Sequence, residues 1–322
     1  DFLIGLYITI SSNSIITGVV SGMIWDVIKI VLHDVLDKLR QSSKEKTSEK
    51  ISEQPNKENG EQETCIKVSL CVRENSKDEY RIGAEYRINR YLNNEDVNIT
   101  TIEDPIEIKL EGINQSQVNP KADITFASCM RAILRQDPDI ILIGEIRDFE
   151  TLEVAISAAL TGHLVLSTVH TNSAAATVTR LIEMGAKDYL VSSTLTGVIA
   201  QRLVRRLCDK CKEEYIPTEE EVKHITTNPE LQQKLMKTKL YRKKGCKECG
   251  YLGFTGRLGI YEIMPITREI KKLIAQGAHD IEIEEAAVAA GMKTLKDSCL
   301  NHIIEGRTTT DEFIRVLGYA SD

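Results

Sequence analysis

Short apolar runs alternate with longer amphipathic runs between residues 97 and 206, and this alternation restricts the fold of the 322-residue chain more than any other feature. The apolar runs are typical of strands that are buried on both faces of a sheet. We expect strands over 97–102, 140–144 and 163–169, and helices over 125–135, 149–161, 173–185 and 187–206. Strands that alternate with helices through short connections form parallel sheets. The sequence therefore predicts an α/β core over residues 92–207, a parallel sheet with helices on both faces.

The residues before this core fall into three segments. Residues 1–39 are predicted to be an apolar and amphipathic helical segment, because apolar residues recur at intervals of three and four along most of it. Its uncharged start leaves two alternatives open, a helix that packs on its own domain or contact with a membrane through residues 2–36. Residues 40–64 are charged and polar, which predicts a disordered linker. Residues 65–91 form an unassigned α/β segment that starts with a strand over 65–73.

The charge and the aromatic content of the chain indicate which classes of macromolecule it can bind. The formal net charge is −7, from 41 basic and 48 acidic residues, and aromatic residues make up 5% of the chain. Nucleic-acid phosphates attract basic surfaces, and unpaired bases stack on aromatic rings. We therefore expect no nucleic acid among the partners.

Four of the eight cysteines form two C-x-x-C pairs, Cys208 with Cys211 and Cys246 with Cys249. Two such pairs supply the four thiolates of a closed tetrahedral Zn²⁺ site. We therefore expect a structural zinc subdomain over residues 208–265. Four unrelated free cysteines are the weaker alternative, and the presence of two pairs argues against a redox site.

The last segment, residues 266–322, shows short helical patterns without a strand-like run. It is predicted to be a helical C-terminal region. Thr309 followed by Glu312 fits a capping box that opens the last helix.

Acidic and histidine side chains stand where the predicted strands end. Glu103 and Asp104 follow the first strand, and Glu145 follows the second. A carboxylate at the tip of a buried strand is the Walker B arrangement, which holds Mg²⁺ or polarises an attacking water. His163 and His170 bracket the third strand. Each feature alone also has a structural explanation, as turn chemistry for the acids and as ordinary structural residues for the histidines.

Two arginines of the predicted helix 125–135 are candidates for phosphate contact. Arg131 and Arg135 are four residues apart, so both lie on one helix face. They either reach phosphate or form a solvated face.

Five motifs follow one another along this core, from residue 99 to residue 208. They are ITTIEDPIE, FASCMRAILRQDPD, GEIRD, TGHLVLSTVHTN and QRLVRRLC. In order and spacing they resemble the secretion-type hexameric ATPases, which drive type II secretion and type IV pilus assembly. The resemblance begins near Leu92 and implies a RecA-like core that hydrolyses ATP with Mg²⁺.

The resemblance also implies roles, partners and a location. The implied roles are aspartate-box acids for Glu103 and Asp104, the Walker B acid for Glu145, the histidine box for His163 and His170, and phosphate-directed arginines for Arg131 and Arg135. Within this family the four-cysteine element marks secretion and pilus-assembly ATPases rather than retraction ATPases. The implied partners are a homo-hexamer or related ATPase subunits and an inner-membrane platform protein. The implied location is the bacterial cytoplasm, at the periphery of the inner membrane.

One expected element of this family has no counterpart. The P-loop, G-x-x-x-x-G-K-[S/T], belongs upstream of the core, and no such string occurs in the chain. We therefore expect the first strand and P-loop of the core to be missing, as in a fused or truncated and catalytically impaired ATPase. The alternative is a non-catalytic, zinc-stabilised interaction or oligomerisation module. A zinc-ribbon nucleic-acid binder is the third and weakest interpretation.

Overall fold

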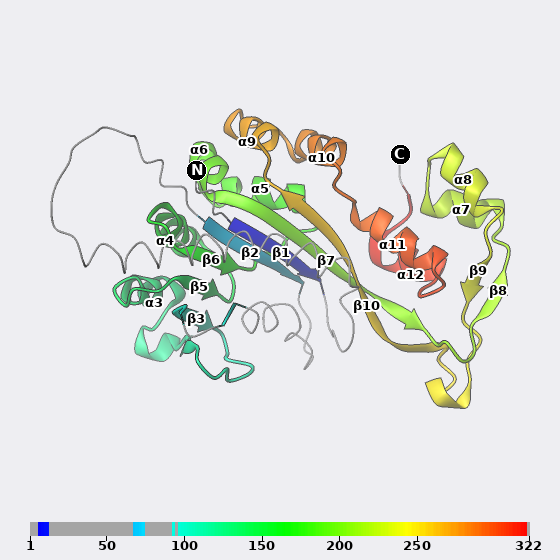
Figure 1. Ribbon diagram of the computed structural model, residues 1–322, viewed down its shortest axis with the longest axis horizontal. Helices are drawn as coiled ribbons and strands as arrows, with labels where there is room; N and C mark the ends of the chain where they lie inside the picture. Colours follow the sequence, from blue (N-terminus) through cyan, green and yellow to red (C-terminus); the bar gives the residue numbers. More distant parts are fainter. Residues whose placement is uncertain (1–5, 13–66, 75–91, 94–95, 321–322) are drawn as a thin grey trace.

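The computed structural model describes residues 6–12, 67–74, 92–93 and 96–320 (Figure 1). Most of the predicted N-terminal helix and all of the predicted charged linker lie outside these described residues. The α/β core, the cysteine-rich part and the C-terminal helices lie within them.

Strand β1 (Leu6–Ser12) corrects the prediction of a helical segment over residues 1–39. Its sequence LYITISS has an apolar residue at every second position, and this period of two suits a strand. The three- and four-residue periodicity that predicted a helix begins only after this run. Strand β2 (Lys67–Glu74) agrees with the strand predicted over residues 65–73.

An eight-stranded sheet runs through the molecule in the order β10-β7-β1-β2-β6-β5-β3-β4, with additional pairings of β7 with β2 and of β1 with β6. Its other strands are β3 (Ile99–Glu103), β4 (Asn114–Gln117), β5 (Ile140–Ile143), β6 (Leu164–Ser167), β7 (Leu195–Leu207) and β10 (Phe254–Pro265). All pairings are parallel except that of β7 with β10. The parallel order confirms the predicted α/β class, to which β10 adds an antiparallel edge strand.

Four helices connect the core strands and bury apolar side chains on the sheet. They are α3 (Phe126–Ile133), α4 (Phe149–Leu160), α5 (Ala174–Glu183) and α6 (Asp188–Thr194). The first three begin at N-caps whose side chains accept a hydrogen bond from the backbone N–H three residues later: Thr125, Asp148 and Ser173. The crossovers from β3 to β5, β6 and β7 run in one direction along the sheet, so right-handed connections place α3, α4 and α5 on one face.

The helix predicted over residues 187–206 is wrong beyond Thr194, where α6 ends and β7 begins. Leu, Ala, Gln and Arg in this run favour a helix, and their apolar positions fit either structure. The pairing decides the outcome, because β7 bonds to β10 along its length and to the central strands on its other edge. Tertiary contacts thus outweigh local propensity here.

The chain beyond β7 forms a cysteine-rich part and a helical end. The elements of the first are β8 (Glu213–Tyr215), α7 (Glu219–Ile225), α8 (Pro229–Leu235), β9 (Leu240–Arg242) and the 3₁₀ turn η3 (Lys247–Cys249). The last helices are α9 (Arg268–Ala275), α10 (Asp280–Ala289), α11 (Leu295–Ile304) and α12 (Thr310–Leu317). These helices confirm the predicted helical C-terminal region.

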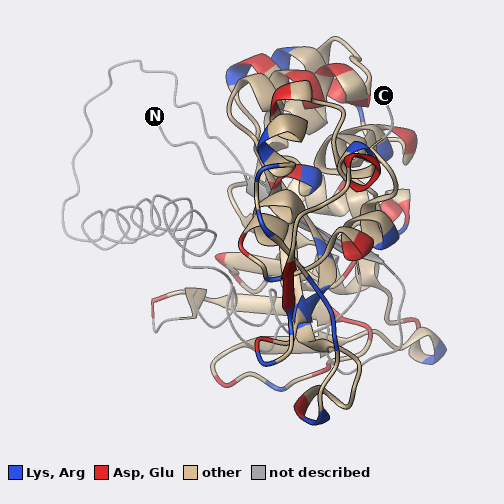
Figure 2. Ribbon diagram, turned by 90° about the vertical axis from the view of Figure 1, so that its right-hand side faces the viewer, with Lys and Arg blue, Asp and Glu red and all other residues tan. Residues whose placement is uncertain are grey.

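The C-terminal helices extend the core beyond the sheet. Helix α9 contacts α6 and α10 contacts α5, while α11 and α12 contact β10 and β7 (Figure 1). Their buried side chains join one hydrophobic cluster with those of the sheet and its crossover helices. Acidic and basic residues are mixed along the helices in the view of Figure 2. Within the described part of the chain, every helix is too short or too polar to span a bilayer.

Candidate functional site

The strand order places the candidate site at the carboxyl edge of the sheet, beside β6. From the central strands the chain leads to β3 on one side of β6, whereas from β6 it leads to β7 on the other side. Connections that part in opposite directions leave a crevice outside the carboxyl ends of the strands, and ligands of α/β proteins bind in such crevices. Residues that follow β3, β5 and β6 therefore surround the candidate site.

The turn after β5 holds Glu145 at this edge. The backbone N–H of Gly144 donates to the Ile102 carbonyl at 2.7 Å, and the Thr168 hydroxyl donates to the Gly144 carbonyl at 2.6 Å. The Ile146 N–H donates to the Thr168 carbonyl at 2.9 Å. A Cβ at Gly144 would lie 3.1 Å from the Ile102 carbonyl oxygen, so glycine permits this close approach. Three strands thus fix the turn that carries Glu145.

The Glu145 carboxylate is buried and paired. Its Oε2 lies 2.7 Å from Nε of Arg147 and 3.3 Å from Nε2 of His170, while Glu145 itself is 5% exposed. The guanidinium of Arg147 is largely exposed. A buried carboxylate needs such partners, because burial of an unpaired charge is costly. The structure therefore brings together two of the predicted site residues, Glu145 and His170.

Glu103 lies at the same edge, at the end of β3. Its Oε1 accepts hydrogen bonds from the Thr101 hydroxyl at 2.6 Å and from Nε2 of Gln115 at 2.9 Å. Asp104 follows it and is exposed. Both acids thus stand one strand away from Glu145, because β3 and β5 are neighbours in the sheet.

Three other predicted site residues lie elsewhere. His163 is at the opposite end of β6 from His170, and its Nδ1 is 2.9 Å from the Ala158 carbonyl oxygen. Arg131 donates to the Glu150 carboxylate at 2.8 Å. Arg135 is exposed beyond the end of α3. In this chain they do not join the carboxyl-edge cluster.

Two arginines of this edge were not predicted. Arg147 belongs to the quoted GEIRD motif but received no role, and its spacing of two from Glu145 is the signal that points to the pair. Arg202 donates from Nη2 to Oδ1 of Asn172 at 2.8 Å, two residues after His170. The sequence pattern predicts a helix in place of β7, and in a helix the side chain of Arg202 has no relation to the sheet edge.

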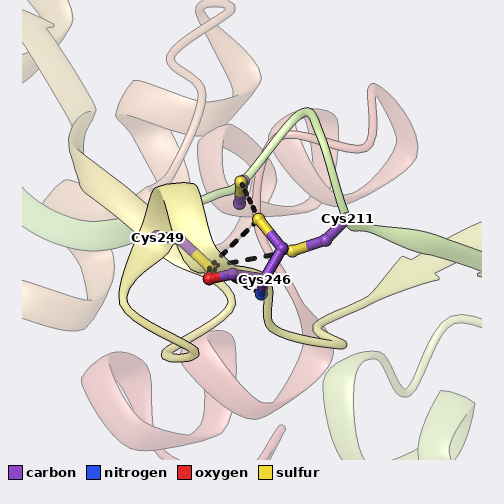
Figure 3. Close-up of side chains that lie close together, drawn as sticks. Cys211, Cys246 and Cys249 are labelled. Carbon is purple, nitrogen blue, oxygen red and sulfur yellow. Dashed lines mark hydrogen bonds between the residues drawn. The ribbon is translucent and has the colours of Figure 1, made fainter.

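The four cysteines form the second candidate site, a metal centre (Figure 3). The sulfur atoms of Cys208, Cys211, Cys246 and Cys249 all lie within 4.8 Å of one another. The sulfur–sulfur distances are 3.9 Å from Cys208 to Cys246, 3.8 Å from Cys211 to Cys249 and 3.7 Å from Cys246 to Cys249. Zinc–sulfur bonds of about 2.3 Å in a tetrahedron require sulfur–sulfur separations of about 3.8 Å. The cluster fits Zn²⁺.

The pairing of β7 with β10 brings the two cysteine pairs together. The first cysteine pair follows β7 and the second precedes β10, and Phe254 of β10 pairs with Leu207 of β7. Both pairs therefore stand at the same end of the two-stranded ribbon of β7 and β10.

Gly253, just after the second cysteine pair, has a φ of 77°, and a Cβ there would lie 2.6 Å from that of Lys243. Its N–H donates to the Cys249 sulfur at 3.2 Å, and hydrogen bonding to the backbone of Cys246 and Gly253 lowers the pKa of Cys249 to about 6. Burial raises the pKa of Cys211 in the same cluster to about 12, so of these two only Cys249 is favoured as a thiolate before a metal binds.

Comparison with known proteins identifies the family. A family model described as type II/IV secretion system protein matches residues 85–315. The chain belongs to this family. The family membership agrees with the sheet order, the carboxyl-edge acids and the cysteine cluster described above.

Curated relatives within the family are similar over the same part of the chain. The type IV pilus assembly ATPase PilB of Thermus thermophilus is 47% identical over 219 residues, which are 68% of this chain and 24% of that protein. Type II secretion system protein E of Pseudomonas aeruginosa is 48% identical over 225 residues, which are 70% of this chain and 44% of that protein. The chain thus spans from about a quarter to under half of the length of these relatives.

Solved structures agree on the fold. The crystal structure of the pilus retraction motor PilT with bound ADP has a TM-score of 0.52 and 26% identity, over 72% of this chain and 56% of that one. The ATPase DotB of Yersinia pseudotuberculosis has a TM-score of 0.51 over 71% of this chain and 52% of that one, at 23% identity. Both confirm the predicted α/β fold.

Proposed function

We propose that the chain is part of a type II secretion or type IV pilus assembly motor. We further propose that its carboxyl-edge site binds Mg-ATP weakly and hydrolyses it negligibly. The pairing of Glu145 with His170 at the carboxyl edge is the observation that supports a nucleotide site most directly. Mg²⁺ would neutralise phosphate charge there. Glu145 is the acid that would hold the metal or orient water, with Glu103 and Asp104 beside it. His170 would contact the phosphates from the same edge.

The weak binding follows from the sequence. A P-loop supplies backbone N–H groups and a lysine to the phosphates, and no P-loop string occurs in these 322 residues. Hydrogen bonds to charged groups contribute roughly 1.5–3 kcal/mol each, so three missing bonds remove at least about 4.5 kcal/mol. Since 1.4 kcal/mol is a factor of about ten, a micromolar site would become about millimolar or weaker.

Calorimetric titration with Mg-ATP and a phosphate-release assay test this proposal on the full chain. We expect no binding in the micromolar range and no release above background. Glu145→Gln should then match the parent chain, as should the control Glu153→Gln at an exposed position of α4. Micromolar binding with turnover that Glu145→Gln abolishes and Glu153→Gln preserves would show an active ATPase and overturn the proposal.

The second candidate function is a non-catalytic, zinc-stabilised oligomerisation module. The cysteine cluster favours it, because its geometry suits a closed structural metal site that needs no nucleotide. In either case we propose assembly as a homo-hexamer or with related ATPase subunits, and contact with an inner-membrane platform protein from the bacterial cytoplasm. Light scattering with and without Mg-ATP separates the two candidates. A module assembles equally in both conditions, whereas a motor subunit with the weak site proposed above assembles further only when Mg-ATP exceeds its roughly millimolar dissociation constant.

A further inference from the structure

Two large exposed side chains form a tip beside the second cysteine pair. Tyr251 and Leu252, here called the tip, follow this pair closely and are 68% and 72% exposed. Their backbone N–H groups donate to the carbonyls of Cys246 at 2.8 Å and of Cys249 at 3.2 Å. The cysteine cluster thus fixes the turn that carries the tip, beyond the end of the ribbon of β7 and β10 (Figure 1).

The backbone of Tyr251 gives a second observation on this turn. Its φ is 61°, in the left-handed region that glycine adopts freely and that a bulky residue adopts at a cost. A glycine would therefore suit the backbone better, and the largely exposed ring contributes little to the core. The fold does not require an aromatic side chain here, which points to a contact outside the chain.

The surface around the tip is basic. Residues 206–212 and 242–257 contain eight basic and two acidic residues, whereas the whole chain has a formal net charge of −7. Zn²⁺ bound by four thiolates carries two negative charges, so these segments remain positive with the metal in place. Lys243, Lys244 and Lys247 are all exposed there. A partner that complements the tip therefore offers apolar side chains flanked by carboxylates.

Helix α10 offers such a surface. Ile281 and Val288 are 67% and 44% exposed, and their spacing of seven places both on one helix face. The helix contains four acidic residues and no basic residue, and Glu282 and Glu285 are exposed on this side. These four residues are here called the α10 face. The buried side chains of the helix lie on its other side, where α10 contacts α5 and α9.

The two complementary surfaces of one chain are too far apart to meet. The tip directly precedes β10, and α10 lies beyond its other end (Figure 1). The 12 residues of β10 span about 40 Å at 3.4 Å per residue. We infer that the tip of one copy of this chain binds the α10 face of a second copy. The inference rests on the self-assembly proposed above and names the contact that produces it.

A contact between two different surfaces repeats from copy to copy. A pair joined in this way still has one tip and one α10 face free, so the assembly grows and becomes a ring where the rotation closes. Lysines that face carboxylates at the rim make the association depend on salt. The small apolar area of the tip predicts a weak single contact, which a closed ring reinforces.

Mixing two variants of the zinc-loaded full chain tests the contact. Tyr251→Gly with Leu252→Ser removes the tip, and Ile281→Gln with Val288→Gln removes the apolar part of the α10 face. In analytical ultracentrifugation we expect the parent chain to form species larger than a dimer. Each variant alone should show a dissociation constant raised at least about tenfold. The 1:1 mixture should form a heterodimer and nothing larger, because it holds one intact surface of each kind.

Three controls separate the contact from general effects on the fold. Ile216→Gln changes another exposed apolar residue of the cysteine-rich part and should leave the assembly unchanged. Tyr251→Gly alone should weaken the assembly but keep the melting temperature within about 2 °C of the parent, since glycine suits the left-handed backbone. Salt raised from about 0.05 M to about 0.5 M should weaken the assembly of the parent chain.

The results that would overturn the inference are distinct from those that would overturn self-assembly itself. Parent assembly that neither variant weakens would place the contact elsewhere and leave the proposed self-assembly intact. Two weakened variants whose mixture forms no heterodimer would show that the tip and the α10 face do not meet. A parent chain that stays monomeric at about 100 μM, with and without Mg-ATP, would overturn both the contact and the proposed assembly.

Discussion

Glu312 shows at the scale of single residues how one buried carboxylate joins distant parts of the chain. It is completely buried in α12 and accepts hydrogen bonds from the side chain and the backbone N–H of Arg205 in β7, and from the side chain of Arg315. The capping box predicted at Thr309 is therefore only half formed. The Thr309 hydroxyl oxygen accepts from the Glu312 N–H at 3.2 Å. The Glu312 carboxylate pairs with Arg205 and Arg315 and does not accept from the Thr309 backbone N–H, as a full capping box requires.

The ion pair makes stability depend on pH. Burial raises the pKa of Glu312, but the hydrogen bonds from Arg315 and Arg205 outweigh it and lower the pKa to about 2. A carboxyl with a lowered folded-state pKa stabilises the fold above its unfolded value of 4.5 and loses this contribution as the pH falls toward 2. We expect Glu312→Gln to lower the free energy of unfolding by about 3 kcal/mol at pH 7, since it breaks a buried pair.

Urea unfolding at a series of pH values checks this prediction. The difference between the parent chain and Glu312→Gln should narrow steadily below pH 4.5. The control Glu220→Gln, at an exposed position in the first turn of α7, should leave the free energy of unfolding unchanged. A penalty for Glu312→Gln that stays constant down to pH 3 would refute an electrostatic role for the carboxylate.

At the scale of elements, the sequence predicts a strand or helix correctly where its local apolar pattern favours the same structure as its contacts in the fold. The apolar runs of β5 and β6 are buried throughout, and no helix suits four residues between turns. Strand β7 was missed because its Leu, Arg and Gln residues suit a helix, and only pairing with β10 decides against it. The same error hid Arg202 from the candidate site, whereas Glu145 and His170 were found because they follow β5 and β6 directly.

Glu262 of β10 links two helices at their first turns. Its carboxylate accepts the backbone N–H of Ala174 in α5 at 2.7 Å and that of Leu295 in α11 at 3.3 Å. Burial raises the pKa of this glutamate. Helix α5 begins just after the stretch with His170 and Asn172, so the C-terminal helices and the candidate site share this carboxylate.

We expect Glu262→Ala to destabilise both helix starts together. Each N–H left buried without a partner costs about 1–3 kcal/mol, so the free energy of unfolding should fall by about 3 kcal/mol. Hydrogen exchange should speed up in peptides that start α5 and α11, and not in those of α4. Glu285→Ala, an exposed position of α10, is the matched control. Faster exchange at only one of the two helices would contradict the shared role.

At the scale of the whole molecule, β7 and β10 connect the core to the cysteine cluster. The ribbon pairs from Gly197 with Pro265, within the core, to Leu207 with Phe254, next to the cysteines. Sequence composition suggests a separate zinc subdomain over 208–265, but β10 within that range is also the edge strand of the core sheet. Such a shared strand favours cooperative unfolding of both parts.

Zinc should therefore stabilise the whole chain. We expect about one zinc per chain by elemental analysis, and Cys211→Ser should lose the metal and more than about 4 kcal/mol of unfolding free energy. Chelation should lower one melting transition without creating a second. Cys129→Ser, which changes a cysteine outside the cluster, should keep the metal. A Cys211→Ser chain that keeps its full zinc content would show that the cluster does not hold the metal and would contradict this prediction.

The cluster also sets how β10 can move along β7. Antiparallel strands slide against each other in steps of two residues, which is about 7 Å at 3.4 Å per residue. The four sulfur atoms lie within 4.8 Å of one another, so a single step would pull the two cysteine pairs out of coordination distance. A metal held at one end of the ribbon thus acts as a lock against shear. Force applied to the C-terminal helices would therefore bend β7 and β10 together, and the two strands would keep their register.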